Sequence, residues 1–328
     1  MPQEQVIALA DYNDLCGENP LWDSTRQLLY WTDLTGRRFY SYDWKNRQSR
    51  IINQQFEICG AAFNEPAPGD DACWVVVNSG GIWLWNGSGS PQLLVSEVEG
   101  QRCNMNDCVA DPVGRLFAGS WFYDPNRQDY PLGHLIRVDQ DGSARIVDEG
   151  IHLSNGLGFS PDQGTLYFAD SVARVIFAYQ YDAKTGNIRN RREFVRVPRS
   201  SGLPDGLTVD AEGYVWCAHW FGGHIVRYDP DGAIERTVPV PAKQTSSLAF
   251  GGPDLTDIFI TSAALSDSLP LAPLGYTRES GYIGGRLFHV NLGIRGREEY
   301  RARIAVGQPS KEGAPVGQAM GGVSFHGN

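Results

Sequence analysis

One short pattern recurs six times along this chain of 328 residues. Each copy starts with a polar residue or a pair of small residues and runs directly into a short apolar strand. The copies start at Glu18, Gly60, Asn106, Asn155, Asp205 and Ser246, at intervals of 42, 46, 49, 50 and 41 residues. One antiparallel sheet unit repeated six times at this period predicts an all-β chain folded as a six-bladed β-propeller.

A second and a third strand follow each start. The second strands are predicted at Leu28–Asp33, Cys73–Asn78, Leu116–Ser120, Leu166–Asp170, Val215–His219 and Ile258–Ser262. The third strands are predicted at Phe39–Asp43, Ile82–Asn86, Leu135–Asp139, Ile176–Asp182, Ile225–Asp229 and Leu287–Asn291. We expect the apolar stretch Val6–Leu9 to pair with the last blade, because an open ring would leave strand edges unpaired. Residues 1–307 are thus expected to form one propeller domain, and residues 308–328, rich in Gly and Pro, a loosely ordered tail.

Composition supports this fold and narrows the range of partners. Aromatic residues make up 11% of the chain and Gly occurs 38 times, which suits strands joined by many tight turns. The formal net charge of −10 argues against nucleic acid or an acidic membrane surface as a partner. The sequence contains no apolar run long enough for a membrane-spanning helix.

The six cysteines lack the spacing of a metal or disulfide motif. They lie at positions 16, 59, 73, 103, 108 and 217, with no Cys-x-x-Cys pair, so neither a disulfide framework nor a zinc ribbon is expected. We interpret them as small buried residues in a reducing compartment. The first residues, Met-Pro-Gln-Glu-Gln-Val, do not resemble a signal peptide, so the expected location is the cytoplasm.

Four of the six repeat starts carry oxygen-bearing side chains, namely Glu18, Asn106, Asn155 and Asp205. Taken singly, each has a structural explanation, since Asn-Gly and Asp-Gly are strong turn signals and a lone Glu is usually solvated. Their shared phase predicts that they meet at one mouth of the central channel. Buried and unpaired, they would be costly, and a cation removes that cost.

The type of ligand indicates the type of cation. Two carboxylates with one or two amide oxygens, and no Cys or His, suit a hard divalent ion such as calcium, magnesium or manganese, while zinc and ferrous iron remain compatible. Three or four protein ligands leave coordination positions open, as in catalytic sites. The small residues Gly60-Ala61-Ala62 and Ser246-Ser247 are expected to leave room for a substrate.

An open metal site in a walled channel favours hydrolysis of an ester-like bond. The ion would polarise a carbonyl or activate water, and Asp205 is the candidate general base. The long connections Trp121–Gly133 and Ala263–Gly285 are expected to overhang the site, with Trp121, Phe122, Tyr123, Tyr276 and Tyr282 as candidate covering side chains, or else to decorate the surface. His219, at a strand end, is either a proton-shuttling group or, more simply, a structural residue.

Several motifs together resemble those of the SMP-30/gluconolactonase/regucalcin-like lactonases. From about Gly17 to Gly293 they occur in the family's order: Gly17-Glu18-Asn19-Pro20-Leu21-Trp22, Asn106-Asp107, Ser154-Asn155-Gly156-Leu157, Pro204-Asp205-Gly206 and Thr245-Ser246-Ser247-Leu248-Ala249-Phe250-Gly251-Gly252. The resemblance implies a six-bladed propeller with one catalytic divalent metal ion held by Glu18, Asn155 and Asp205. It also implies that Asp205 is the general base, that Asn106 contacts substrate or metal, and that the reaction opens a sugar lactone to its aldonic acid.

One position departs from the pattern of that family. Many members have Arg two residues before the Asn-Asp pair, where it binds substrate hydroxyls, but this chain has Asn104, and its nearest Arg is Arg102. We expect Asn104 and Asn106 to contact the substrate, and Asp124 could stand in for an acidic residue of the blade-three loop. The alternative functions are a phosphotriesterase-like hydrolase on the same propeller, or a non-enzymatic metal-binding or scaffold propeller.

Overall fold

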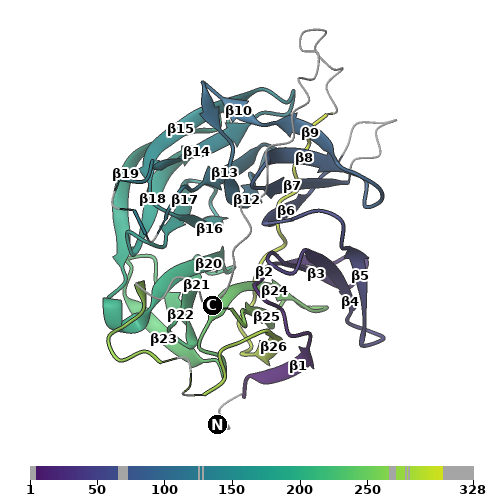
Figure 1. The fold of residues 1–328 in the computed structure, drawn as a ribbon, viewed down its shortest axis with the longest axis vertical. Coiled ribbons are helices and arrows are strands. Elements are labelled where there is room, and N and C mark those ends of the chain that lie inside the picture. Colours follow the sequence, from purple (N-terminus) through teal and green to yellow (C-terminus); the bar gives the residue numbers. More distant parts are fainter. Residues whose placement is uncertain are drawn as a thin grey trace.

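Six four-stranded antiparallel sheets form a ring (Figure 1). The computed structural model describes residues 5–65, 73–124, 126–127, 129–265, 271–277, 279 and 281–305. The fold is the predicted six-bladed β-propeller. Arg199–Ser201 forms a short 3-10 turn, and no helix in the described residues is long and apolar enough to cross a membrane. The predicted tail, 308–328, lies outside the described residues.

Each blade is numbered here by its order along the chain, with the innermost strand first. Blades 1 and 2 consist of β2 (Gly17–Asp23), β3 (Leu28–Asp33), β4 (Arg38–Asp43) and β5 (Gln48–Asn53), then β6 (Gly60–Phe63), β7 (Trp74–Asn78), β8 (Gly81–Trp85) and β9 (Gln92–Val95). Blades 3 and 4 consist of β12 (Met105–Ala110), β13 (Leu116–Ser120), β14 (Gly133–Val138) and β15 (Ala144–Ile151), then β16 (Ser154–Phe159), β17 (Thr165–Asp170), β18 (Val175–Asp182) and β19 (Asn187–Arg196). Blades 5 and 6 consist of β20 (Leu203–Val209), β21 (Val215–Trp220), β22 (His224–Tyr228) and β23 (Ile234–Pro239), then β24 (Thr245–Gly251), β25 (Asp257–Ser262), β26 (Arg286–Asn291) and β1 (Ile7–Asp11). A small hairpin, β10 (Glu97–Val98) with β11 (Gln101–Arg102), lies between blades 2 and 3 in sequence.

The ring is closed by its first strand. β1 pairs antiparallel with β26, with Ala8 opposite Phe288 and Asp11 opposite Arg286. The expectation that the stretch before the first repeat completes the last blade is therefore confirmed, with a strand shifted slightly toward the C-terminus. β1 is the fourth strand of the sixth blade, so the outer edge of β26 is paired and every blade has four strands.

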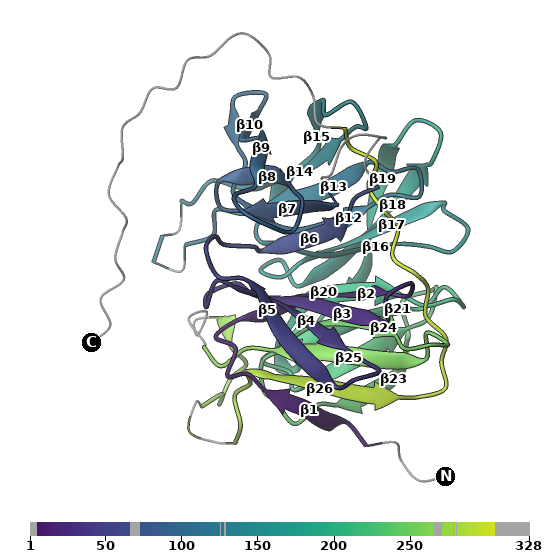
Figure 2. The ribbon, with the colours of Figure 1, turned by 90° about the vertical axis from the view of Figure 1, so that its right-hand side faces the viewer.

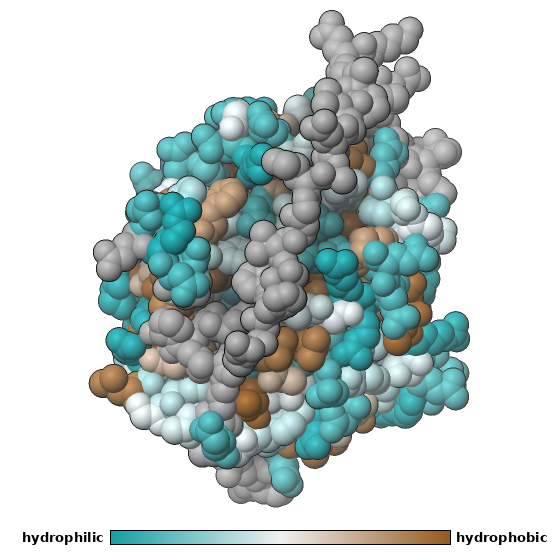
Figure 3. Space-filling view, viewed as in Figure 1, coloured by the Kyte–Doolittle hydropathy of each residue, from teal (hydrophilic) through white to brown (hydrophobic). Residues whose placement is uncertain are grey.

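Six hydrophobic clusters hold the blades together, one at each junction between neighbouring sheets. Large fully buried side chains fill them, such as Trp31 between blades 1 and 6, Phe117 between blades 3 and 4, and Trp216 between blades 5 and 6. The inner strands of the blades are therefore buried on both faces, and their sequences are rich in Val, Ile and aromatic residues rather than strictly alternating, whereas the outermost strands are largely exposed. By contrast, the face in Figure 3 is mostly hydrophilic, with hydrophobic residues in small separate groups.

One face of the ring is crossed by the C-terminal strap, defined here as residues 292–305. Figure 2 shows this yellow segment running along one side of the disc. Its backbone bonds the turn of blade 5 through Arg295 O, which accepts from Ala211 N at 3.0 Å, and the turn of blade 3 through Arg303 N, which donates to Gly114 O at 2.8 Å. It also forms a bridge to blade 2, between Ala302 and Asn64. The strap therefore covers the end of the channel opposite the starts of the inner strands.

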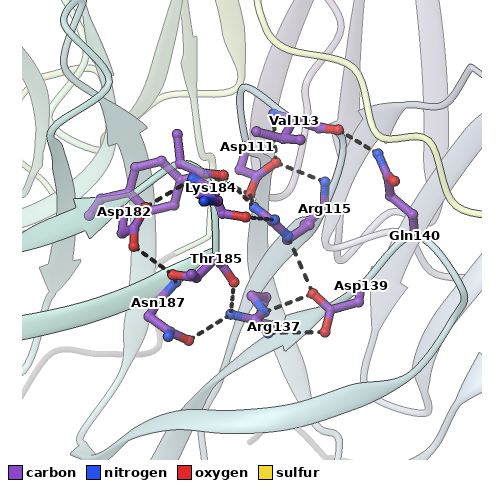
Figure 4. Close-up of polar contacts among 12 residues, drawn as sticks. Asp111, Val113, Arg115, Arg137, Asp139, Gln140, Asp182, Lys184, Thr185 and Asn187 are labelled. Atoms are coloured by element: carbon purple, nitrogen blue, oxygen red, sulfur yellow. Dashed lines mark hydrogen bonds and ion pairs between the residues drawn. The ribbon is translucent and has the colours of Figure 1, made fainter.

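Buried carboxylates fix the turns after the inner strands and link neighbouring blades (Figure 4). Asp111 is fully buried at the turn after β12 and accepts hydrogen bonds from the backbone N–H groups of Val113 and Arg115, at 2.9 and 2.8 Å. The Arg115 guanidinium pairs with the same carboxylate at 3.0 Å and reaches the Ala183 carbonyl of blade 4 at 3.1 Å. The Tyr181 hydroxyl donates the remaining bond, at 2.7 Å. Each oxygen of this buried carboxylate is thus satisfied by the chain itself.

The six cysteines all lie within the described residues and remain thiols. The absence of a disulfide framework fits the expectation from their spacing. Four of them are buried, as expected, but Cys73 is exposed and Cys16 is half-buried. The expectation of burial is wrong for Cys73, because it lies directly before β7, outside the strand that was predicted to begin with it.

Candidate functional site

The starts of the inner strands are tied to one another around the channel. Asn19 of β2 accepts a hydrogen bond from the Ala61 backbone N–H of β6, at 2.8 Å. Asn106 of β12 donates to the Ser154 carbonyl of β16, at 2.8 Å, and Ser246 of β24 donates to the Gly17 carbonyl, at 2.5 Å. These bonds join β2 to β6, β12 to β16 and β24 to β2 near the starts of the inner strands.

Two glycines let the inner strands approach each other closely. A Cβ on Gly156 would lie 2.1 Å from Leu207 N of the next blade, and a Cβ on Gly206 would lie 2.1 Å from Ser247 Oγ. Both glycines lie inside strands, β16 and β20, with no positive φ. The turn interpretation of Asn155-Gly156 and Asp205-Gly206 is therefore wrong, and each glycine is needed for packing next to the polar residue before it.

Asp205 is a buried carboxylate with an unsatisfied oxygen. Its exposed fraction is 3%, and its Oδ1 has no hydrogen-bond partner. Burial, followed by the nearby Glu18 and Asp107 carboxylates, holds the pKa of Asp205 well above its ordinary value. A hydrogen bond from Asn155 opposes this shift but does not cancel it. In a protein interior, an orphaned carboxylate oxygen of this kind calls for a partner from outside the chain.

Glu18 faces the same point from blade 1. Burial and the Asp107 carboxylate raise the pKa of Glu18 well above its ordinary value, and Glu18 in turn raises that of Asp205. Because the Glu18 carboxylate raises the pKa of Asp205, the two groups lie close enough to share a positive charge. Without a cation, the pair is more stable when it holds a proton.

Asn155 supplies the third side of the site. It is buried, and its Nδ2 donates to Ser171 Oγ, at 3.1 Å. The Ser171 hydroxyl in turn donates to the Pro204 carbonyl, at 2.7 Å, directly before Asp205. Because the amide nitrogen is committed to Ser171, Oδ1 is the Asn155 atom that can serve a cation. Ser171 thus positions both Asn155 and the chain that carries Asp205.

The chemistry of this set fits a hard divalent cation. Glu18 and Asp205 supply two negative charges and Asn155 an amide oxygen, and the orphaned Asp205 Oδ1 is the atom that most needs a partner. Among the described residues, no three His, Cys, Asp or Glu side chains gather as a metal site by themselves. The candidate set differs because one of its three members is an amide. Its role as a metal site stays a prediction.

The two predicted substrate contacts lie beside this set on blade 3. Asn106 is half-buried at the start of β12, and its side chain is tied to blade 4 through Ser154. Asn104, one residue before that strand, donates from Nδ2 to the Trp121 carbonyl at 2.7 Å, and Trp121 N donates back to the Asn104 carbonyl at 3.0 Å. Asn104 therefore fastens the blade-three loop to the rim of the site.

Both long connections begin at this end of the ring. Trp121 forms an antiparallel bridge to Leu153, two residues before Asn155. In the described part of the blade-six loop, Ala272 packs against Leu203, two residues before Asp205, together with Tyr276. Of the other candidate covering side chains, Tyr123 packs edge-to-face on Tyr130 with ring centroids 5.1 Å apart, and Tyr282 lies under the Arg286 guanidinium, 4.5 Å from it. The loops are thus anchored within a few residues of the site.

His219 has a structural role in this arrangement. It is fully buried; Nδ1 donates to the Ser201 carbonyl at 2.8 Å, and Nε2 accepts from the Tyr228 hydroxyl at 3.0 Å. Burial, assisted by His224, lowers the pKa of His219 to about 3. An imidazole that stays neutral, with both nitrogens bonded inside the protein, is not arranged to carry protons to a substrate.

Three side chains near the site were not predicted to act there. Ser171 and Asp107 adjoin the predicted residues, and Glu299 of the strap raises the pKa of Asp107 from below. Ser246 was expected to leave room for a substrate, but it is fully buried and bonded to Gly17 and Thr261, so it seals the junction of blades 6 and 1. Asp107 was detectable in the sequence as the neighbour of Asn106; Ser171 and Glu299 follow no repeat phase.

Residues 16–264 match the family described as SMP-30/Gluconolactonase/LRE-like region. The chain belongs to this family. The matched segment covers all six repeat starts, including Glu18, Asn155 and Asp205. The resemblance inferred from the motifs is therefore confirmed at the level of the family.

Individual relatives extend the match to nearly the whole chain. A pentonolactonase, XacC, of Haloferax volcanii is 32% identical over 92% of this chain and 99% of its own length. Regucalcin of Danio rerio is 32% identical over 75% of this chain and 82% of its own. Among solved structures, a calcium-binding protein, regucalcin, from Agrobacterium tumefaciens has a TM-score of 0.77 and 26% identity, covering 92% of this chain and 98% of that one.

Proposed function

We propose that this protein hydrolyses a small sugar lactone to the aldonic acid, using one divalent cation held by Glu18, Asn155 and Asp205. The observation that carries the proposal is the buried Asp205 carboxylate, whose Oδ1 lacks a partner next to a second carboxylate. A scaffold has no need of a buried Asp205 carboxylate whose pKa is raised further by the neighbouring Glu18 carboxylate. The pentonolactonase that aligns with nearly the whole chain supports a lactone as substrate, and the calcium-binding regucalcin supports a divalent ion.

The residues of this chain divide the work of a hydrolytic reaction. When bound, a divalent cation supplies Lewis-acid polarisation of the lactone carbonyl. Asp205 would bind the cation through one carboxylate oxygen and accept the proton of the attacking water with the other. Ser171 would hold Asn155 and the chain before Asp205 in place. Burial keeps bulk water away from Asp205, which strengthens every electrostatic interaction there.

Substrate hydroxyls would meet amide groups on blade 3. Asn106 is half-buried at the rim, and Asn104 is fixed to the blade-three loop through Trp121. Asp124, also half-buried, lies on that loop and would accept a hydrogen bond from a substrate hydroxyl. Amides and one carboxylate suit a neutral polyhydroxy ring such as a pentonolactone or hexonolactone.

The first test is turnover of a panel of aldonolactones, with spontaneous opening subtracted. We expect Asp205→Asn to lower kcat/KM by about a thousandfold, because it removes a general base and a cation ligand. Asp231→Asn, the same substitution at an exposed turn of the same blade, is the matched control and should keep normal activity. A wild-type rate no greater than the buffer rate for every lactone would overturn the proposal, and an organophosphate ester in the panel separates the phosphotriesterase alternative.

The second test removes and restores the cation without following activity. Treatment with a chelator should lower the Tm, and adding calcium, manganese, magnesium or zinc should restore it. At one hundred times Kd, a ligand that binds only the folded state adds about 2.7 kcal/mol to the free energy of unfolding. Asp205→Asn should lose this response while Asp231→Asn keeps it. Equal cation-induced shifts in the two variants would show that the ion binds elsewhere.

A further inference from the structure

The channel below the candidate cation site is closed by a carboxylate from the C-terminal strap. A cavity of about 40 Å³ lies there, lined by residues from the inner strands of all six blades and by Glu299 and Tyr300 of the strap. Asn19, Asp107 and Ser247 are among its polar lining residues. Glu299 is therefore a floor residue of the same channel whose mouth holds Glu18 and Asp205.

The position of Glu299 is fixed by the strap around it. One residue away, Tyr300 packs on Phe159 at the end of β16, with ring centroids 6.3 Å apart. Two residues before it, Arg297 Nη1 donates to the Phe159 carbonyl at 3.2 Å. The Thr208 hydroxyl of β20 bonds the Glu299 carboxylate, whose pKa is raised by burial. The half-buried Glu299 is thus held between two blades by the contacts of the strap.

Asp107 connects this floor to the mouth. It lies on β12, where Oδ1 accepts the Cys108 backbone N–H at 2.7 Å, and it lines the same cavity as Glu299. Burial, with Glu299 adding to it, raises the pKa of Asp107 to about 6. The Asp107 carboxylate in turn raises the pKa values of both Glu18 and Asp205. Four carboxylates thus interact electrostatically along the channel. They are Asp205 and Glu18 at the mouth, Asp107 below them and Glu299 at the floor.

The lower two of these carboxylates have no basic partner that neutralises them. Within the described residues, neither Asp107 nor Glu299 forms an ion pair, although the Arg297 guanidinium opposes the rise in the pKa of Glu299. This differs from the turn after β12, where buried Asp111 pairs with Arg115. A positive charge at the mouth would favour the ionised form of Asp107, which has no cationic neighbour of this kind.

We propose that Glu299, acting with Asp107 along the channel, raises the affinity of the Glu18–Asn155–Asp205 site for multivalent cations by through-space attraction, without ligating the ion. Glu299 then acts on the bound cation through its charge alone. The strap that covers the far end of the ring thereby contributes to cation binding at the mouth. This inference rests on the proposed cation site. It also predicts a selectivity for higher charge, because a fixed negative charge attracts an ion in proportion to that ion's charge.

The test compares cation affinity in Glu299→Gln, Glu299→Asp and Glu298→Gln. Glu298 is the exposed neighbour on the strap, so Glu298→Gln removes the same charge outside the channel. Titration with calcium, followed by calorimetry, should show about a tenfold weaker Kd for Glu299→Gln. Glu298→Gln should match the wild type, and Glu299→Asp should retain most of the affinity. Thermal unfolding in chelator checks that each variant is folded.

Ion charge separates attraction from a structural disturbance. Terbium, followed by its luminescence, carries three charges, so a tenfold loss for calcium becomes about thirtyfold for terbium if the effect is electrostatic. Equal losses for the two ions, or unchanged affinity in Glu299→Gln, would overturn the inference alone. Absence of cation binding in the wild type would overturn the proposed function together with it. If Glu299→Gln does not fold, Asp107→Asn removes charge from the blade side of the same channel and must show the same dependence on ion charge.

Discussion

Asp111 and Asp205 are both buried carboxylates on inner strands or their turns, yet the chain treats them in opposite ways. Asp111 has no exposed surface and is bonded by two backbone N–H groups, the Arg115 guanidinium and the Tyr181 hydroxyl. Asp205, with an exposed fraction of 3%, has an oxygen with no partner and lies near another carboxylate. Asp111, at one end of the ring, thus has all its partners within the chain. Asp205, at the other end, needs a positively charged partner from solution.

The same solution for a structural carboxylate recurs around the ring. At the turn after β20, buried Asp210 pairs with Arg227 at 2.7 Å and accepts the Trp216 indole N–H at 2.9 Å. At the turn after β2, Asp23 pairs with Arg26 at 2.9 Å. At these three turns the chain places a guanidinium next to a buried carboxylate that supports the fold. Buried Asp170 instead accepts hydrogen bonds from three backbone N–H groups. Asp205 differs from all of them because its Oδ1 has no partner within the described chain, which marks a candidate binding site.

The largest expected change in the free energy of unfolding follows substitution of Asp111, the carboxylate whose two oxygens are both hydrogen-bonded. Asp111→Ala would remove the nearer of the two carboxylates that pair with Arg115 and would leave the buried Tyr181 hydroxyl and two backbone N–H groups without their acceptor. Breaking a buried pair in this way should lower the free energy of unfolding by about 3–5 kcal/mol. Urea denaturation measures it. A loss below about 1 kcal/mol would mean that Asp111 is not the structural counterpart of Asp205 described here.

Asp14 provides an intermediate case whose stability depends on pH. It is buried under Trp31, Tyr40 and Arg38, and burial raises its pKa to about 6 from 3.8. The folded state therefore binds the proton more tightly than the unfolded state, so the stability contributed by the protonated form is complete below pH 3.8 and is lost as pH rises through 6. The difference corresponds to about 3 kcal/mol. Asp14→Asn should remove that part of the pH dependence, measured by urea denaturation between about pH 4 and pH 7.

If stability of the Asp14→Asn protein kept the wild-type dependence on pH, a group other than Asp14 would be responsible for that dependence. Glu57→Gln is the matched control. It removes a carboxylate on another connection of blade 1, where the group bonds the exposed Ser79. This control should leave the profile unchanged.

The smallest expected change is an increase in the free energy of unfolding, and it tests the role of Asp205 most directly. In chelator, Asp205→Asn should raise the free energy of unfolding by about 1–3 kcal/mol, because it removes an unpaired buried charge next to Glu18. Saturating cation should reverse the order, since only the wild type keeps the ligand. Urea titrations with and without cation measure both. Destabilisation of the cation-free variant would contradict the contrast with Asp111.

The repeat made most of the fold predictable. The strand Leu116–Ser120 was predicted with its observed bounds, and Leu28–Asp33 likewise, because strand and turn chemistry alternate at a fixed period. The closing strand shifted, from Val6–Leu9 to Ile7–Asp11, since its bounds depend on the register with β26 rather than on its own residues. The strap, 292–305, was not predicted as a separate feature, because its bonds go to turns of many blades and follow no period.

The candidate site was predictable only where it follows the repeat. Glu18, Asn155 and Asp205 share one phase, so their convergence at one end of the ring could be expected from spacing alone. Ser171 and Glu299 could not, since one lies in a turn after β17 and the other beyond the last strand. Their roles arise from contacts between blades, and a one-dimensional pattern does not carry such contacts. The burial of Ser246 likewise depends on how tightly blades 6 and 1 meet.

The pairing of β1 with β26 sets an order of events for the growing polypeptide. The ribosome makes Ile7–Asp11 long before it makes Arg286–Asn291, so the earliest strand must wait for almost the entire chain before it finds its partner. Such a distant contact is slow to form, and an unfinished ring exposes strand edges meanwhile. Ser246, which joins the sixth blade to the first beside Glu18, is also a late product of translation. A nascent chain therefore has no assembled pocket at the mouth of its channel until synthesis is nearly complete.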